Sequence, residues 1–85
     1  MSHVRTVVEI VARGLADHPD KVAVTETPHR QGTLVELSMA PGDLGRVIGR
    51  QGRTAAALRT LVAIVAERAG TKAQLEFRDA YGSGE

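Results

Sequence analysis

The stretch Val47-Ile48-Gly49-Arg50-Gln51-Gly52-Arg53-Thr54 places two glycines around two long polar side chains. An apolar pair precedes the first glycine and an alanine-rich run follows the second, which predicts a helix, a tight exposed loop and a second helix. Glycine has no Cβ atom, so the backbone can turn sharply and a ligand can approach it closely. The stretch therefore predicts a binding loop.

The surroundings of this loop favour an anionic ligand. A helix that begins near Arg53 aims unpaired N–H groups and the positive end of its dipole at the loop. No Asp or Glu occurs between Leu44 and Ala66, although the whole chain has a net charge of only +1. Four arginines lie in this region without an acidic neighbour in the sequence: Arg46, Arg50, Arg53 and Arg59. A phosphate group is the natural partner.

The spacing of the glycines indicates which class of phosphate-binding loop the sequence contains. A nucleotide-binding P-loop needs a Lys after its second glycine, and a dinucleotide fingerprint needs G-x-G-x-x-G after a strand, so neither fits. G-x-x-G between two helices is the loop by which KH modules hold about four nucleotides of a single strand. An ordinary helix–helix turn also often contains glycine. The arginines alone would more often form a solvated helix face, but together with the geometry of the loop they favour nucleic acid.

Regular elements extend in both directions from the loop. Pro41 and Gly42 break the preceding strand, and a short helix over Asp43–Ile48 has Asp43 at its positive end. The helix after the loop has an apolar face that is predicted to end at Gly70, formed by Leu58, Leu61, Val62, Val65 and Ala69. Alternating residues then predict a strand over Thr71–Arg78, with Ala73, Leu75 and Phe77 on its core face.

The first half of the chain predicts a helix and a hairpin. A helix over Ser2–Asp17, with Ser2 as a possible N-cap, ends before Pro19, and its core stripe is Val4, Val7, Val8, Val11 and Leu15. Strands over Lys21–Thr27 and Thr33–Met39 follow, joined by a loop over Thr27–Gly32.

These elements give an α+β fold with the order α-β-β-α-α-β. Three helices on one face of a three-stranded sheet is the compact arrangement. A right-handed crossover through two helices places the last strand beside and parallel to the second, which makes a mixed sheet. We expect one domain over residues 1–79 and a flexible tail over 80–85, which has little apolar content.

Composition excludes several classes of protein. The 85 residues include no Cys, and the three His have no metal-ligand spacing, so no disulfide framework or metal site is expected. Nothing resembles a signal peptide or an apolar run that could span a membrane, which predicts a cytoplasmic protein. No pair of nucleophile and base and no cofactor motif is present. We expect neither an enzyme nor a bound cofactor.

The segment from Pro41 to Thr54 resembles the signature of the small stand-alone bacterial KH proteins, the KhpA family. Leu15-Ala16-Asp17-His18-Pro19-Asp20 is also similar to that family, and the resemblance runs from about Val4 to Phe77. It implies a type II (prokaryotic) KH fold. It also implies a groove between the helix–loop–helix and the last strand with its neighbouring variable loop, over a floor of Leu44, Val47, Ile48, Ala55, Leu58 and Leu75.

From the loop and this resemblance we expect an RNA-binding site. Its predicted residues are Arg46, Val47, Ile48, Gly49, Arg50, Gln51, Gly52, Arg53, Thr54, Arg59 and Lys72. Only Phe77 and Tyr81 are aromatic, so few rings are available to stack bases and weak sequence specificity is expected.

The resemblance further implies a single-stranded RNA partner and a role as RNA chaperone or post-transcriptional regulator. It implies a homodimer, or a heterodimer with a larger KH protein like KhpB. Two alternatives stay open. The chain is a dimerisation or adaptor subunit with secondary RNA contacts, or it binds single-stranded DNA, since a backbone clamp separates the two nucleic acids poorly.

Overall fold

We describe the structure from a computed structural model, which places residues 3–30, 32–49 and 52–80. Three α-helices, one short 3₁₀ helix and three strands follow one another in the order α1 (His3–Leu15), η1 (Pro19–Lys21), β1 (Ala23–His29), β2 (Gly32–Met39), α2 (Pro41–Ile48), α3 (Arg53–Arg68) and β3 (Ala73–Asp79). This is the α+β element order predicted for a type II KH fold, with η1 as an additional element that was not predicted.

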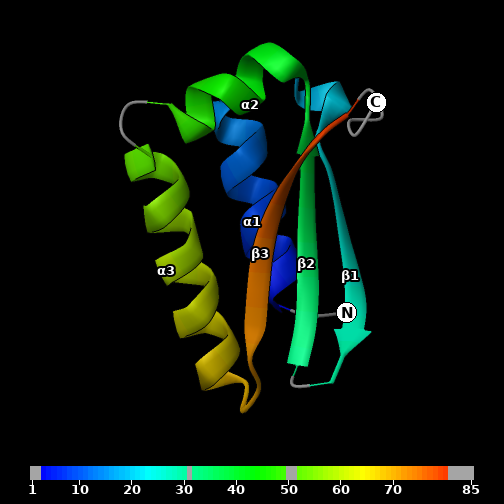
Figure 1. The fold of residues 1–85 in the computed structure, drawn as a ribbon, viewed down its shortest axis with the longest axis vertical. Coiled ribbons are helices and arrows are strands. Elements are labelled where there is room, and N and C mark those ends of the chain that lie inside the picture. The colour runs from blue at the N-terminus through cyan, green and yellow to red at the C-terminus, as the bar shows by residue number, and fades with distance from the viewer. Residues whose placement is uncertain (1–2, 31, 50–51, 81–85) are drawn as a thin grey trace.

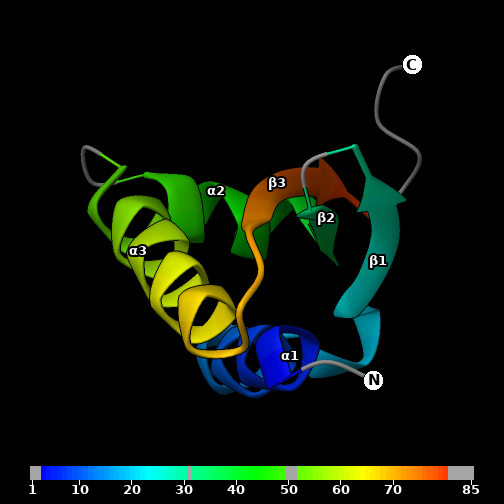
Figure 2. The same cartoon turned by 90° about the horizontal axis from the view of Figure 1, so that it is seen from below.

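The sheet has the strand order β1-β2-β3 (Figure 1). β1 and β2 form an antiparallel hairpin, with Val24 opposite Leu37. β3 pairs with β2 in parallel, with Leu75 opposite Val35. The mixed sheet and the crossover through α2 and α3 are therefore confirmed. Figure 2 shows the sheet curving around the helices, which cover one of its faces.

The core lies between that face and the helices. Alternate residues of β2, namely Val35, Leu37 and Met39, are fully buried, as the period of two in a half-buried strand requires. They pack against the buried stripes of α1 and α3. The prediction that these stripes include Leu15 and Ala69 is wrong. Leu15 and Ala69 are exposed at the helix ends, and the small side chains of Ala12 and Ala66 are buried instead.

The hairpin is tighter than predicted. β1 runs from Ala23 to His29 and β2 starts at Gly32, so most of the expected loop over Thr27–Gly32 is strand. Pro28 lies in this extension of β1 although proline cannot donate a ladder hydrogen bond. It is tolerated because β1 is an edge strand.

The helix ends show one correction and one confirmation. α2 begins at Pro41, not Asp43, since proline suits the first helical position, where no N–H partner is needed. α3 ends as predicted before Gly70, which has a φ of 77°. The Gly70 N–H donates to the Glu67 carbonyl and the Thr71 N–H to the Ala66 carbonyl, the Schellman arrangement of a helix C-terminus.

The predicted N-cap Ser2 and residues 81–85 of the predicted tail lie outside the described residues. Ala80, the first residue of that tail, still donates its N–H to the Met39 carbonyl at 2.9 Å, so the sheet contact extends to this position. In the part of the chain that the structure describes, every helix is too short or too polar to cross a bilayer.

Candidate nucleic-acid interface

The two glycines of the loop are needed for different physical reasons. Gly49 has an ordinary φ of −61°, but its N–H lies 2.7 Å from the Gly45 carbonyl oxygen. A Cβ atom at Gly49 would lie 2.7 Å from that same oxygen. Gly52 has open space around it but a φ of 69°, in the left-handed region that glycine adopts most easily. Arg50 and Gln51 lie outside the described residues.

The N-terminus of α3 opens onto this loop. Gly52 occupies the N-cap position and provides no side-chain hydrogen bond to the first turn, which also contains no acidic residue. The first N–H groups of the helix therefore have no carboxylate of their own turn beside them, and Arg53 at the first position is exposed. An uncapped helix N-terminus with an adjacent arginine favours an anion.

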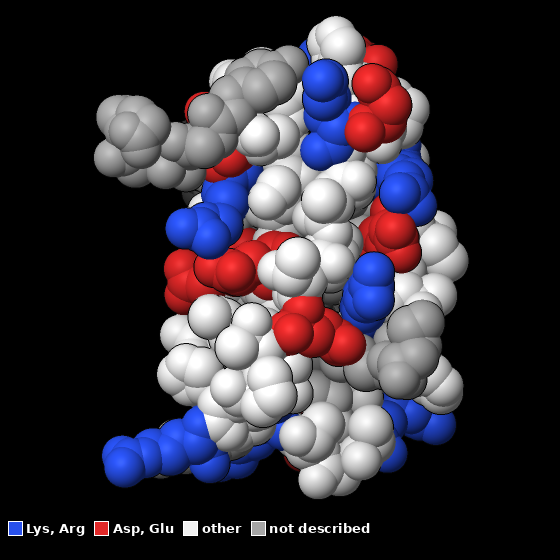
Figure 3. Space-filling model, turned by 90° about the vertical axis from the view of Figure 1, so that its right-hand side faces the viewer, with Lys and Arg blue, Asp and Glu red and all other residues white. Residues whose placement is uncertain are grey.

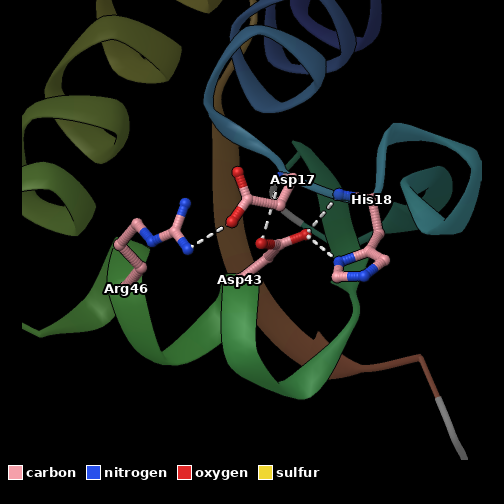
Figure 4. Close-up of polar contacts among 4 residues, drawn as sticks. All are labelled: Asp17, His18, Asp43 and Arg46. Atoms are coloured by element: carbon pink, nitrogen blue, oxygen red, sulfur yellow. Dashed lines mark hydrogen bonds and ion pairs between the residues drawn. The ribbon is translucent and has the colours of Figure 1, made fainter.

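A polar cluster joins α2 to the segment that follows α1 (Figure 4). The Asp43 side chain is 2% exposed. Its Oδ1 accepts the Asp17 N–H at 3.1 Å and its Oδ2 accepts the His18 N–H at 2.9 Å. His18 Nδ1 lies 3.4 Å from the same Oδ2. Asp43 lies in the first turn of α2, at the positive end of the helix as predicted, but its oxygens accept N–H groups of the backbone that leaves α1.

This cluster favours the charged forms of both carboxylates. Burial raises the pKa of Asp43, but the hydrogen bonds from Asp17 and His18 outweigh it and hold the pKa below its usual value. The hydrogen bond and charge of Arg46 lower the pKa of Asp17. The same contact raises the pKa of Arg46, so the pair is ionised across the physiological range.

Arg46 is not the uncompensated cation that the sequence suggested. Its Nη2 donates to Asp17 Oδ2 at 2.6 Å. Asp17 is 29 residues away in the chain, which is why the absence of acids between Leu44 and Ala66 gave the wrong expectation. The signal that was missed is the Asp-His pair directly before Pro19, whose N–H groups need acceptors once α1 has ended.

Residues expected to bind RNA together lie on two flanks of α2. Two positions apart on a helix are about 200° apart around its axis, so Arg46 and Ile48 face nearly opposite ways. Arg46 faces Asp17, and beside it a recess of about 270 Å³ is lined by Leu15, Arg46, Val47 and Thr54. Ile48 is 43% exposed on the other flank. Val47 is buried in the core.

Arg59 lies at the outer edge of β3. Its Nε donates to the Leu75 carbonyl at 3.4 Å, and its guanidinium lies 5.0 Å from the centre of the Phe77 ring. The Lys72 carbonyl and the Ala80 N–H point to β2. Since backbone groups alternate between the two edges of a strand, those of Leu75 and Phe77 face away from the sheet. Arg59 thus links α3 to an edge where main-chain groups are available.

Lys72 does not lie near the loop. It directly precedes β3, at the opposite end of α3 from Gly52 (Figure 1). Its carbonyl accepts the Thr33 N–H at 2.9 Å beside the hairpin turn. Of the expected floor residues, Ala55, Leu58 and Leu75 are buried like Val47, and Leu44 is partly buried. Ile48 is the most accessible apolar side chain of that set.

The side of the molecule around β1 is not a basic surface. Figure 3 shows Lys and Arg interspersed with Asp and Glu there. Arg78 pairs with Glu36 across β3 and β2 at 3.2 Å. Among the described residues, no group of three or more His, Cys, Asp or Glu is arranged to hold a metal ion.

Comparison with known proteins agrees with this architecture. Residues 5–77 match the family described as KhpA/KhpB, KH domain. The RNA-binding protein KhpA of Aquifex aeolicus is 42% identical over 77 residues, which cover 91% of this chain and 98% of that protein. The KhpA of Halalkalibacterium halodurans is 44% identical over 88% of this chain and 99% of its own length. The KhpA of Mycobacterium bovis is 54% identical over 72% of this chain and 76% of its own length.

These relatives carry the names of binding proteins and not of enzymes, in agreement with the expectation that the chain is not an enzyme. The matched region begins inside α1 and ends inside β3, so it includes the whole helix–loop–helix and the parallel strand pair. The chain belongs to the KhpA/KhpB family of KH-domain proteins.

Proposed function

We propose that this protein binds single-stranded RNA through the loop from Gly49 to Gly52 and the N-terminus of α3. The observation that carries the proposal is the uncapped, acid-free first turn of α3 next to the exposed Arg53. The relatives are named RNA-binding proteins, which supports the same ligand. Backbone N–H groups and Arg50 and Arg53 hold phosphates, which positions the strand without reading its sequence.

The bases lie over Ile48 towards the outer edge of β3. That edge offers main-chain N–H groups that donate to base edges and C=O groups that accept from them, and Arg59 lies beside it. Both features tolerate many sequences, since Phe77 is the one aromatic residue in the described part of the chain and Arg59 already lies over its ring. We therefore propose a chaperone or regulator of broad RNA specificity, acting in the cytoplasm.

The test is fluorescence anisotropy of a labelled single-stranded RNA with the wild type and the double variant Arg50→Asp, Gln51→Asp, at two salt concentrations. We expect wild-type binding that weakens with salt and is lost in the variant. A control with the same charge change, Ala63→Asp with Arg68→Asp, alters the far half of α3 and should retain most of the binding. Circular dichroism checks that all three proteins are folded.

Equal binding by the loop variant and the control would place the RNA site elsewhere. Competition with a DNA strand of the same sequence addresses the DNA alternative. A lower affinity for DNA supports contacts to the 2′-hydroxyl groups. Equal affinity favours a backbone clamp that accepts both nucleic acids.

A second candidate function is that of an interaction subunit. It is favoured by two large apolar side chains that remain exposed on helices packed against each other, Ile10 of α1 at 67% and Ile64 of α3 at 49%. A homodimer or a pair with a KhpB-like protein would cover such residues. Sedimentation velocity of the wild type and of Ile64→Glu tests this. A concentration-dependent dimer that the variant lacks supports it, whereas a monomer at every concentration excludes the homodimer.

A further inference from the structure

The buried carboxylate of Asp43 attaches the first turn of α2 to the chain that leaves α1. It accepts two backbone N–H groups, from Asp17 and His18, and contacts the His18 ring. In the described residues no buried polar side-chain atom lacks a hydrogen-bond partner, so this attachment is fully satisfied. The start of α2 is therefore fixed to the segment at 17–18.

Arg46 makes a second attachment to the same segment. It lies three residues after Asp43 and thus on the same side of the helix, one turn closer to the loop. Its Nη2 reaches Asp17 Oδ2 at 2.6 Å, a length typical of a strong charge-assisted hydrogen bond. Asp17 thus takes part in both attachments, through its N–H to Asp43 and through its carboxylate to Arg46 (Figure 4).

Two attachments along an eight-residue helix restrict both its position and its rotation. α2 ends at Ile48, and the turn that begins the loop is closed by the bond from the Gly49 N–H to the Gly45 carbonyl. Any rotation of α2 would move Ile48 and Gly49 with it. The last turn of α2, which contains Arg46, is the part that determines where the loop begins.

We propose that Arg46 supports RNA binding as a positioning residue, acting through Asp17 on the orientation of α2, and not as a ligand of phosphate. Its guanidinium is bound to a carboxylate, and it faces the flank opposite to Ile48. This inference rests on the proposed function, because its readout is RNA affinity. It departs from the expectation that all four arginines near the loop contact RNA.

The two roles predict opposite results for Asp17→Asn. If Arg46 were a phosphate ligand, removing its carboxylate partner would free it and strengthen RNA binding. If it is a positioning residue, the same change loosens α2 and weakens binding about two- to fivefold, the range expected for loss of one exposed ion pair. Arg46→Gln should weaken binding by a similar factor.

The charge-exchanged protein Asp17→Arg, Arg46→Asp gives the sharpest test. An acidic residue at position 46 repels phosphate, so a ligand role predicts that the exchange binds RNA as poorly as Arg46→Asp alone. A positioning role predicts recovery to within about twofold of the wild type, because the ion pair is restored with reversed polarity. The experiment is RNA anisotropy at about 0.15 M salt, where charges farther than about 8 Å are screened.

A control pair exists within α1. Glu9 and Arg13 form an exposed ion pair at 2.9 Å that does not involve α2. Glu9→Gln should leave RNA affinity unchanged. This control separates the general effect of losing an ion pair from the specific effect of losing the Asp17–Arg46 pair. Stronger binding by Asp17→Asn, no change in Asp17→Asn and Arg46→Gln, or an exchange no better than Arg46→Asp overturns the proposal.

Amide hydrogen exchange without RNA supplies an independent readout. The His18 N–H should exchange faster in Asp17→Asn and Arg46→Gln than in the wild type and Glu9→Gln, because its bond to Asp43 joins α2 to the segment that leaves α1 and opens more often once the second attachment is lost. Unchanged His18 N–H exchange in both variants contradicts the positioning role. If the wild type binds no RNA, the proposed function fails, yet amide hydrogen exchange still decides whether Arg46 orients α2. The same measurement on the single variants decides the question if the Asp17→Arg, Arg46→Asp protein does not fold.

Discussion

At the scale of single residues, Asp43 shows how one buried carboxylate fixes a connection that has no regular structure. The chain between α1 and η1 has N–H groups that neither helix can satisfy, and Asp43 accepts two of them. A buried N–H without an acceptor is costly. The carboxylate therefore substitutes for secondary structure at this point.

Replacing Asp43 by Asn should lower the stability of the protein at neutral pH. Asn keeps the shape but presents one carbonyl oxygen and an NH₂ group, which cannot accept the second N–H. We expect a fall in Tm of about 5–10 °C, measured by circular dichroism. Asp20→Asn, an exposed carboxylate in η1, should change Tm little.

The same substitution should change the response to acid. The pKa of Asp43 is lower in the folded protein than the ordinary value of 3.8, so its stabilisation is complete above about pH 5. That stabilisation is lost as the pH falls below 3.8 and through the folded pKa. The gap in Tm between wild type and Asp43→Asn should therefore narrow below pH 4, as a pH series of melting curves would show. A gap independent of pH would contradict the pKa argument.

At the scale of elements, Arg59 connects α3 to β3 at the outer edge of the sheet. Its guanidinium lies over the Phe77 ring and its Nε binds the Leu75 carbonyl. Phe77 is only partly buried, so the arginine covers part of the ring that water would otherwise reach. Arg59 thus supports the edge of β3 as well as adding positive charge beside it.

A double-mutant cycle with Arg59→Gln and Phe77→Leu should detect this contact. We expect a coupling of about 0.5–1 kcal/mol in the free energy of unfolding, measured by urea denaturation, as for cations over rings at exposed sites. Arg78→Gln with Phe77→Leu is the matched control, since Arg78 pairs with Glu36 instead. Additive effects in the Arg59 cycle would show that the ring contact contributes nothing to stability.

Periodicity predicted the elements well where one face of an element is buried. The alternation in β2 and the helical stripe of α3 fixed their faces, and Gly70 fixed the end of α3. The boundary at Pro28 failed because the edge position of β1 overruled local preference, and the boundary at Pro41 failed because proline itself suits the first position of a helix. The site was predicted in part. The loop glycines follow from local geometry, whereas the Asp17–Arg46 pair joins residues distant in sequence and leaves no periodic signal.

At the scale of the whole molecule, the predicted RNA contacts extend along the full length of α3. Its 16 residues span about 24 Å, with the loop at one end and Lys72 beyond the other. A strand of about four nucleotides held by the loop does not need to reach Lys72. Because of this distance, we expect Lys72 to contact only longer RNA.

RNA length should therefore separate the two ends of the surface. Lys72→Gln should leave the affinity for a tetranucleotide unchanged and weaken binding of a strand of about twelve nucleotides, in anisotropy titrations at fixed salt. Arg53→Gln, next to the loop, should weaken both. If Lys72→Gln lowered the affinity for both RNA lengths by the same factor, RNA would follow a different path across the protein.

The parallel pairing of β2 with β3 also affects how the protein is made. The two strands of the β1–β2 hairpin are neighbours in the sequence, but β3 is synthesised after the other helices and strands of the described residues. Until then the edge of β2 is unpaired and Leu37 and Met39 lack part of their cover. The loop emerges well before the strand edge that completes the proposed RNA surface. A nascent or truncated chain that ends before Ala73 therefore contains the loop without that edge, and the unpaired edge of β2 makes it prone to aggregation.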